Sequence, residues 1–196
     1  MDKNRYYHLW IAAAKDQVFF SSNLDKAFFI SLFQDLLSPR NHLCVPPNHR
    51  QKIASQLDLV AYSLTDFGMN LLVYAPDTET VEVFGQSLLI RYATHLNQQS
   101  SWEMLPFDTI FAHDLLQDEY EALSISREIH LLHDDWRNDR YSSIGFYLDD
   151  RRGDWIQPWR ITKLYSNNPH TYLNYLLESE KEYTRQGLMQ LDFLET

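Results

Sequence analysis

Two apolar segments separated by a short polar one constrain the fold of this chain most strongly. Leu57–Leu64 and Met69–Ala75 are rich in leucine, valine and tyrosine, and the four residues Thr65–Gly68 lie between them. Apolar runs of this length, bounded by turn residues, are typical of buried strands. The sequence therefore predicts two strands joined by a turn.

The other segments alternate between strand and helix patterns. Before the two apolar segments, the sequence predicts a strand over Tyr6–Ala14 and a helix over Leu24–Leu37, which follows the capping residues Ser21-Ser22-Asn23. After them it predicts a helix capped by Thr78 or Thr80 and a short strand within Trp102–Phe111. Two further helices are predicted, one that starts with the capping box of Asp118 and Glu121, and a last one over Pro169–Gln186. The aromatic segment Tyr141–Leu148 fits either a short helix or a strand, and the proline-rich Ser38–Gln51 is predicted as a loop.

This order of elements favours an α+β fold, in which helices cover one face of an antiparallel sheet. Charge and glycine at Asp149–Gly153 interrupt the pattern, so we predict one domain over residues 1–150 and a C-terminal helical extension, residues 151–196, packed on it. The apolar helical positions expected to face the core are Phe84, Leu88 and Tyr92, then Ala122, Ile125, Ile129 and Leu132, and finally Leu173, Leu176 and Leu177.

Composition and charge restrict the classes of partner. With 27 acidic and 17 basic residues, the formal net charge is −10, which weakens the long-range attraction to nucleic acid but leaves room for a local basic groove. No apolar run approaches the ~20 residues of a membrane helix, and the N-terminus lacks an apolar signal core. The single cysteine, Cys44, excludes an internal disulfide framework and a cysteine-based zinc cluster. We expect a cytoplasmic protein without a membrane partner.

The segment Val60–Val73 resembles the metal-binding strand of the HUH single-tyrosine transposases, in particular the REP-associated tyrosine transposases. That strand carries Ala-Tyr before a His-x-His pair and Leu-Leu after it. Ala61-Tyr62 and Leu71-Leu72 match, but Gly68 and Asn70 stand at the two histidine positions. Further segments that resemble the family in the same order are Tyr7-His8-Leu9, Phe19-Phe20 with the helix after it, Arg91–Asn97, Ser126–Leu131, Asp139–Leu148 and Asp154-Trp155-Ile156. The resemblance implies a ferredoxin-like sheet whose central strand carries the histidine positions.

The chemistry of this family needs groups that the chain lacks. The family cuts single-stranded DNA with a tyrosine, a weak nucleophile with a pKa near ~10, at a phosphodiester polarised by Mg²⁺ or Mn²⁺. The resemblance places Glu128 at the nucleophile position and Leu132 at the third metal-ligand position. Because Gly68, Asn70, Glu128 and Leu132 all replace the expected groups, we predict no catalytic residue, no metal ligand and no cofactor.

This prediction does not depend on the alignment register. None of the eight histidines belongs to a His-x-His pair, and no tyrosine is followed four residues later by Gln, Asn, His or Glu. A shifted alignment therefore does not restore the site.

Other groups of polar residues have two interpretations each. His130 and His133 share a helix face and could bind a metal, or they could be surface histidines near a helix C-terminus. Glu128 and His130 suggest acid–base work but diverge on a helix. Ser142-Ser143, without a base nearby in sequence, fits a turn or cap. The basic residues Arg151, Arg152, Arg160 and Lys163 could contact phosphate or belong to a solvated surface.

Three functions remain open at this level. The first is binding of single-stranded or hairpin DNA without cleavage, for which the candidate residues are Tyr7, His8, Arg91, Arg127, Arg140 and Tyr141. The second is a protein–protein interaction module on the same fold, which the acidic balance supports. The third is an active nuclease with a rearranged site.

Overall fold

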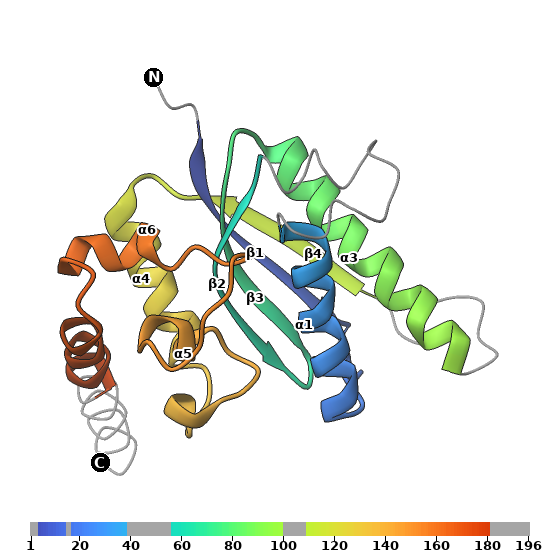
Figure 1. Ribbon diagram of the computed structural model, residues 1–196. Helices are drawn as coiled ribbons and strands as arrows, with labels where there is room; N and C mark the ends of the chain where they lie inside the picture. Colours follow the sequence, from blue (N-terminus) through green and yellow to red (C-terminus); the bar gives the residue numbers. More distant parts are fainter. Residues whose placement is uncertain (1–3, 15–16, 39–55, 100–108, 181–196) are drawn as a thin grey trace, which may run out of the picture.

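Four antiparallel strands form a sheet at the centre of the molecule, in the order β2-β3-β1-β4 (Figure 1). The computed structural model describes residues 4–14, 17–38, 56–99 and 109–180 of the chain. The strands are β1 (Arg5–Ala13), β2 (Asp58–Thr65), β3 (Gly68–Ala75) and β4 (Thr109–Leu115). With helices between β1 and β2 and between β3 and β4, this strand order is the ferredoxin-like one. The predicted α+β fold with an antiparallel sheet is confirmed.

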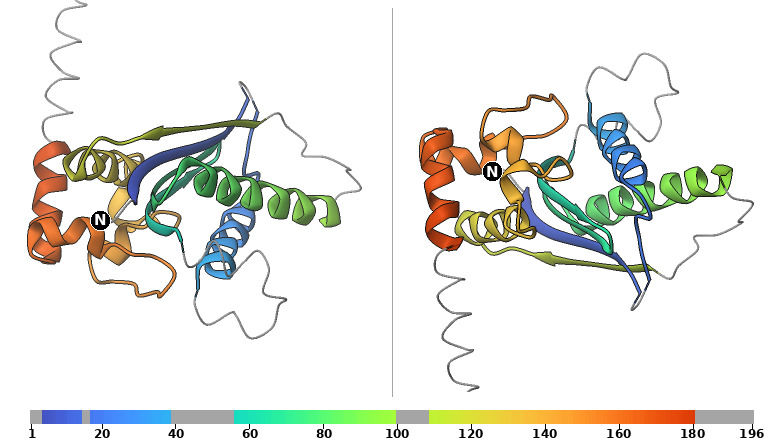
Figure 2. Two further views of the ribbon diagram at one scale, coloured as in Figure 1. Left: turned by 90° about the horizontal axis from the view of Figure 1, so that it is seen from above. Right: turned by 90° about the horizontal axis from the view of Figure 1, so that it is seen from below.

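One face of the sheet is covered by α1 (Asn23–Leu37) and α3 (Thr78–Gln99), as Figure 2 shows from two sides. Alternate residues of β1 point to this face, because successive side chains of a strand point in opposite directions. Leu9 and Ile11 are fully buried there, in one cluster with Phe29 of α1 and Phe84 of α3. The helices between the strands thus lie on one face, as the sequence predicts.

The opposite face carries a second layer, which the sequence pattern does not indicate. It is built from α4 (Glu119–His130), α5 (Ile144–Tyr147), α6 (Trp159–Thr162), two short 3-10 helices (Trp136–Asn138 and Lys163–Tyr165) and the helical residues 169–180. Its buried cluster joins strand residues such as Tyr6, Val60 and Leu72 to Ile129, Ile144 and Tyr172. The sheet is therefore enclosed between two apolar cores.

The outer edge of β2 is closed by chain from the second layer. The backbone N–H of Ser143 donates to the carbonyl of Tyr62 at 2.8 Å, and that of Gln157 donates to the carbonyl of Leu59 at 2.8 Å. Ser142 and Ile156 form isolated bridges with β2 at these two points. Because an open strand edge invites pairing with other chains, this cover protects the sheet on the β2 side.

Residues after position 150 belong to both cores. Trp155 and Ile156 are buried with the α1 and α3 helices, whereas Ile161, Tyr172 and Leu176 are buried with α4. The predicted extension is thus integrated into the sheet-covering layers.

Two of the predicted helix caps are confirmed and one is corrected. The Ser22 hydroxyl accepts from the N–H of Asp25 at the start of α1. Asp118 accepts from the backbone at the start of α4, and the Glu121 carboxylate reaches back to the N–H of Gln117 at 2.6 Å. For α3 the cap is Asp77, whose carboxylate accepts from the N–H of Thr80 at 2.8 Å, and not Thr78 or Thr80.

The predicted inward face of α4 is partly wrong. Ala122 and Ile129 are buried, but Leu132 is 44% exposed, because α4 ends at His130 and the helical phase is lost after it. The positions that are buried in addition are the polar Ser126 and His130.

Some predicted segments divide differently. Tyr141–Leu148 contains both a strand-like and a helical part, because Ser142 forms a β-bridge and α5 follows it. Residues 39–51 of the predicted loop, residues 102–108 of the predicted short strand region and residues 181–186 of the last helix lie outside the described residues. Within the described part of the chain, no helix has both the length and the apolar character needed to cross a membrane.

Candidate functional site

A groove of about 710 Å³ lies between the sheet and the C-terminal end of α4. His8 of β1 and Asn70 of β3 project into it from the sheet. Its other lining residues are Glu128 and Ile129 of α4, then Leu131, Leu132, His133 and Asp134 after the helix, Trp136, and Glu180 of the last helix. The volume is in the range of ligand sites, which is ~300–1,000 Å³.

Three of the four positions that the resemblance assigns to the metal site and the nucleophile line this groove. Asn70, Glu128 and Leu132 line it together, although they come from β3, α4 and the segment after α4. His8, a predicted nucleic-acid contact, lines it too. The fold therefore brings these side chains, which are distant in the sequence, into one place.

Gly68 does not take part. It starts β3 and pairs with Ala12 of β1. A Cβ atom on Gly68 would lie 2.3 Å from the carbonyl oxygen of Ile11 and 2.6 Å from Cα of Ala12. Since both are backbone atoms, β1 would have to move before any side chain, histidine included, could stand at position 68.

The polar groups of the sheet face are already paired with each other. His8 Nε2 lies 3.1 Å from Asn70 Oδ1, so the imidazole donates and the amide oxygen accepts. Burial lowers the pKa of His8, while the hydrogen bond to Asn70 and the Glu128 carboxylate oppose this effect. The sheet side of the groove therefore presents an imidazole that is hydrogen-bonded to an amide and favoured in its neutral form.

The charge of the groove is negative. Glu128, Asp134 and Glu180 contribute carboxylates, and none of the residues named above as its lining is a lysine or an arginine. None of them carries a hydroxyl or thiol group that could attack a phosphodiester. Among the described residues there is also no cluster of three or more His, Cys, Asp or Glu side chains arranged to hold a metal ion.

The other predicted nucleic-acid contacts are dispersed. Tyr7 is 3% exposed and points into the core under α1 and α3. Arg91 lies on α3, on the far side of the sheet from the groove. The Arg127 guanidinium stacks 5.7 Å from the ring centre of Tyr175. The structure therefore does not join these three residues to His8.

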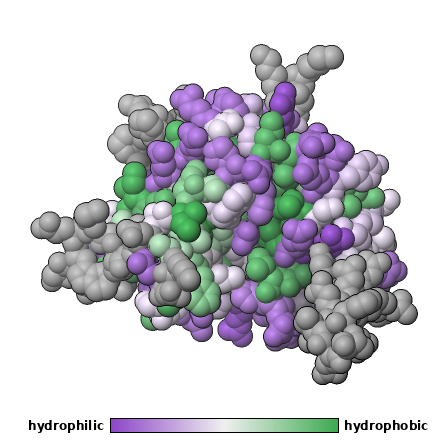
Figure 3. All heavy atoms as spheres, turned by 180° about the vertical axis from the view of Figure 1, so that it is seen from behind, coloured by the Kyte–Doolittle hydropathy of each residue, from purple (hydrophilic) through white to green (hydrophobic). Residues whose placement is uncertain are grey.

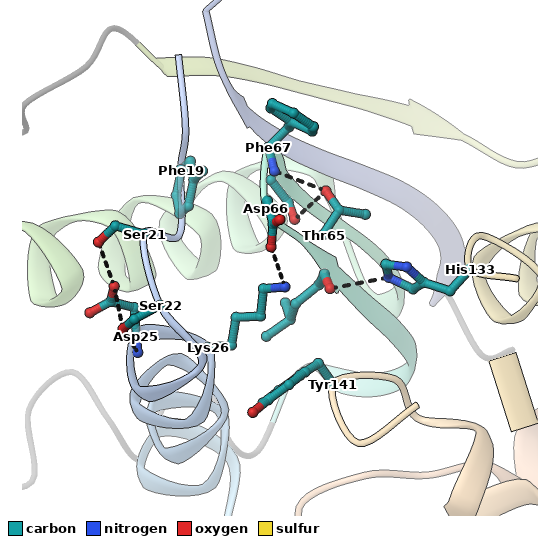
Figure 4. A network of polar contacts seen from close by, with 12 residues as sticks. Phe19, Ser21, Ser22, Asp25, Lys26, Thr65, Asp66, Phe67, His133 and Tyr141 are labelled. Carbon is teal, nitrogen blue, oxygen red and sulfur yellow. Dashed lines mark hydrogen bonds and ion pairs between the residues drawn. The ribbon is translucent and has the colours of Figure 1, made fainter. Parts of the chain in front are cut away.

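Arg140 and Tyr141 lie on the turn that precedes α5. Arg140 is exposed, and its carbonyl accepts a hydrogen bond from Arg151. The Tyr141 ring lies 5.3 Å from Nζ of Lys26, which in turn donates to Asp66 at 2.6 Å (Figure 4). Tyr141 thus helps to hold α1 against the β2–β3 turn.

His130 is fully buried and links three elements. Its Nδ1 lies 2.8 Å from the hydroxyl of Tyr172 in the last helix, and its Nε2 lies 2.7 Å from the hydroxyl of Ser143. The Ser143 hydroxyl also accepts from the N–H of Tyr62 in β2 at 2.9 Å. Sequence reasoning does not find this role, since Ser143 and Tyr172 are distant from His130 along the chain.

The Ser126 end of this chain of hydrogen bonds fixes its direction. The Ser126 hydroxyl donates to the carbonyl of Leu123 at 2.8 Å, so it accepts from the Tyr172 hydroxyl at 3.1 Å, and Tyr172 in turn accepts from Nδ1–H of His130. The other ring nitrogen of a neutral imidazole, Nε2, then accepts from the Ser143 hydroxyl. Burial, with the charge of Arg151, lowers the pKa of His130 to about 3. The fold therefore requires the neutral imidazole.

His133 lies apart from His130. Its Nε2 lies 3.3 Å from the carbonyl oxygen of Leu64 (Figure 4). The same nitrogen lies 3.6 Å from a carboxylate oxygen of Asp139. The two histidines thus form neither a metal pair nor a pair of surface residues: His130 is a core residue, and His133 is at the rim of the groove.

The basic residues near the C-terminal side are mostly engaged inside the protein. Arg151 donates to the carbonyls of Asp139, Arg140 and Ser142, which fixes the turn before α5. Arg160 pairs with Asp58 of β2, and Lys163 pairs with Glu119 of α4. Of the four arginine and lysine residues considered from sequence, Arg152 fits the solvated interpretation, since its side chain is 86% exposed beside Asp149.

The surface seen from behind is mixed (Figure 3). Hydrophobic residues lie in bands between hydrophilic ones on this face. Exposed apolar residues of β4 and of the segment after α4 include Ile110, Leu115 and Leu132.

Comparisons of the chain with protein-family models, with curated proteins and with solved structures found no match.

Proposed function

We propose that this protein is a transposase-like binding protein that does not cut DNA. The groove beside α4 would be the place where a transposase of the HUH class holds its metal and nucleophile, and here it would serve binding alone. The expected cytoplasmic location and the expected lack of a cofactor belong to this proposal.

One observation carries the proposal. Asn70, Glu128 and Leu132, which come from distant parts of the sequence, line a single groove. Among the described residues that line it, there is no tyrosine, serine, threonine or cysteine. The positions that the resemblance assigns to the nucleophile and to two metal ligands are thus occupied by residues without a hydroxyl group or an imidazole.

Buried tyrosines do not supply a substitute nucleophile. Burial raises the pKa of both Tyr6 and Tyr62 to about 12, with further contributions from neighbouring charges. Tyr62 is 0% exposed on the α1 side of the sheet. These observations argue against an active nuclease with a rearranged site.

The test is a cleavage assay with labelled single-stranded and hairpin oligonucleotides, with Mg²⁺ or Mn²⁺ present, resolved on a denaturing gel. An active single-tyrosine nuclease serves as the positive control. We expect the oligonucleotides to stay intact. Cleavage above the level of a protein-free sample would contradict the proposal.

Non-cleaving DNA binding is a second candidate, and a separate surface favours it. A hollow of about 410 Å³ is lined by Arg137, Arg140 and Arg151, together with Asn138, Asp139, Gly145 and Asp150. Arg137 and Arg140 are exposed. Arginine side chains on a concave surface are suited to phosphate.

A gel-shift titration with hairpin DNA at two salt concentrations tests this candidate. If DNA binds there, the double variant Arg137→Gln/Arg140→Gln weakens binding at least about tenfold and lowers its salt dependence, because two phosphate contacts are lost. The variant Arg152→Gln, an exposed arginine outside the lining of the hollow, is the matched control. Absence of any salt-sensitive shift in the unmodified protein would remove this candidate.

A further inference from the structure

The groove beside α4 combines apolar walls with uncompensated negative charge. Ile129, Leu131 and Leu132 provide aliphatic surface. Among the described residues, the structure gives neither Glu128 nor Asp134 an ion-pair partner, and both side chains are exposed. Carboxylates without a partner make the potential at the mouth of the groove negative and attract cations.

The third carboxylate is held in position. Nε1–H of the Trp136 indole donates to Oε1 of Glu180 at 3.3 Å, which ties the last helix to the segment after α4. Trp136 itself is 4% exposed. Glu180 therefore faces the groove from the side opposite the sheet, and the carboxylates come from α4, from the segment after it and from the last helix.

The sheet side adds no positive charge at neutral pH. Burial is the main effect on the pKa of His8 and lowers it, and the ring is hydrogen-bonded to Asn70. Among the described lining residues, a phosphate group in the groove would meet three carboxylates and none of the lysine or arginine side chains that bind nucleic acid. The charge thus disfavours DNA as the occupant.

We propose that this groove binds a basic side chain, arginine or lysine, presented next to an apolar residue by a protein partner. The aliphatic stem of such a side chain packs against Leu131 and Leu132, and its charged end reaches the carboxylates of Glu128 and Asp134. A volume of about 710 Å³ accommodates more than one side chain. This inference rests on the proposed function, because it assumes that the groove binds and does not cut.

Two capped peptides of five residues test whether the groove binds a basic side chain. In one peptide leucine alternates with arginine, and in the other leucine alternates with glutamate. Each is titrated into ¹⁵N-labelled full-length protein, and the indole N–H signal of Trp136 reports on the groove. We expect the arginine peptide to shift this signal in a saturable manner, and the glutamate peptide to leave it unchanged. A single-stranded oligonucleotide of equal concentration should not compete.

Charge variants locate the interaction. The double variant Glu128→Gln/Asp134→Asn should bind the arginine peptide at least about tenfold more weakly. Both side chains are exposed, so the variant keeps the fold, which a thermal melt verifies. Glu79→Gln in the first turn of α3, on the other side of the sheet, is the matched control and should bind like the unmodified protein.

The outcomes separate this inference from the proposed function. No shift up to millimolar arginine peptide, equal shifts with the glutamate peptide, or unchanged binding in the double variant would each overturn it, while leaving the proposal of a non-cleaving protein intact. Cleavage of DNA in the separate gel assay would instead overturn the proposed function.

Discussion

His130 is a histidine whose buried position depends on its being neutral. Both ring nitrogens are used, Nε2 as an acceptor from Ser143 and Nδ1–H as a donor to Tyr172. A proton added to Nε2 would put a charge in a fully buried place and would deprive the Ser143 hydroxyl of the nitrogen to which it donates. Protonation must therefore disrupt the link between α4, the last helix and β2.

This requirement predicts a pH dependence of stability. The pKa of His130 is lowered to about 3 in the folded protein, against its ordinary 6.5. Below pH 6.5 the unfolded state binds the proton more readily than the folded state does. The contribution of neutral His130 to the free energy of unfolding is therefore complete above pH 6.5 and is lost as the pH falls toward 3. Between pH 8 and pH 5 the loss is about 2 kcal/mol, at ~1.4 kcal/mol for each unit below the ordinary value.

Urea unfolding at several pH values measures this pH dependence of the free energy of unfolding. The variant His130→Asn should lose this part of the pH dependence, although it is less stable at every pH. His170→Asn, at an exposed position, is the control and should keep the unmodified slope. An unchanged slope in His130→Asn would show that the imidazole is not held neutral.

Gly68 is a second residue whose identity is fixed by its surroundings. A Cβ atom there meets the backbone of Ile11 and Ala12 at distances of 2.3 and 2.6 Å. We predict that Gly68→Ala lowers the free energy of unfolding by about 3 kcal/mol, the upper range for an overpacked site. Asn70→Ala, two residues along the same strand, removes one partly exposed hydrogen bond and should cost only about 1 kcal/mol.

Chemical denaturation of both variants decides this point. An equal loss in the free energy of unfolding for both variants, or a Gly68→Ala variant as stable as the unmodified protein, would mean that β1 moves easily to make room for a side chain. In that case the argument that a histidine cannot stand at position 68 would lose its physical basis.

At the scale of elements, the strands and most helices are predictable because local patterns determine them. Apolar runs mark β2 and β3, and the capping side chains of Ser22 and Asp118 mark the starts of α1 and α4. The cap of α3 is predictable from sequence as well. Aspartate is preferred over threonine as an N-cap residue, and Asp77 directly precedes the helix.

The buried face of α4 is not predictable in the same way. A helical pattern assigns polar residues to solvent, yet Ser126 and His130 point inward because Tyr172 supplies their hydrogen-bond partner from the last helix. Such a partner is invisible to an argument based on periodicity. For the same reason the acidity of the groove is not predictable, since Asp134 and Glu180 reach it from two unrelated segments.

The link between α4 and the last helix gives a prediction of its own. Tyr172→Phe leaves Nδ1–H of His130 without an acceptor in a fully buried place and removes the partner of Ser126. We expect a loss of about 2 kcal/mol in the free energy of unfolding, typical of a buried polar group without its hydrogen bond. Tyr120→Phe, at a residue that is 73% exposed, should change it by less than about 0.5 kcal/mol. A Tyr172→Phe variant with unaltered stability in thermal or urea unfolding would contradict the stabilising role of this link.

At the scale of the whole molecule, residues after position 150 contribute to both cores. Trp155 and Ile156 are buried in one core, and Ile161, Tyr172 and Leu176 in the other. Burial of a large apolar side chain contributes ~1.5–3 kcal/mol, so these five together contribute on the order of 10 kcal/mol, similar to the stability of a typical domain.

We therefore predict that a chain of residues 1–150 does not fold cooperatively. Its amide NMR spectrum should show poor dispersion, and its thermal denaturation should show no sharp transition, whereas the full chain gives both. A cooperative transition for residues 1–150 would instead support a self-contained domain with a separate extension.

The central claim for the molecule is the proposal that the groove beside α4 serves binding and does not cut DNA. Its most direct test is intact-protein mass spectrometry after incubation with single-stranded and hairpin DNA and Mn²⁺, since the class of enzyme that the sequence resembles attaches itself covalently to the strand it cuts. Our account predicts only the unmodified mass. A species heavier by the mass of a DNA fragment would contradict it.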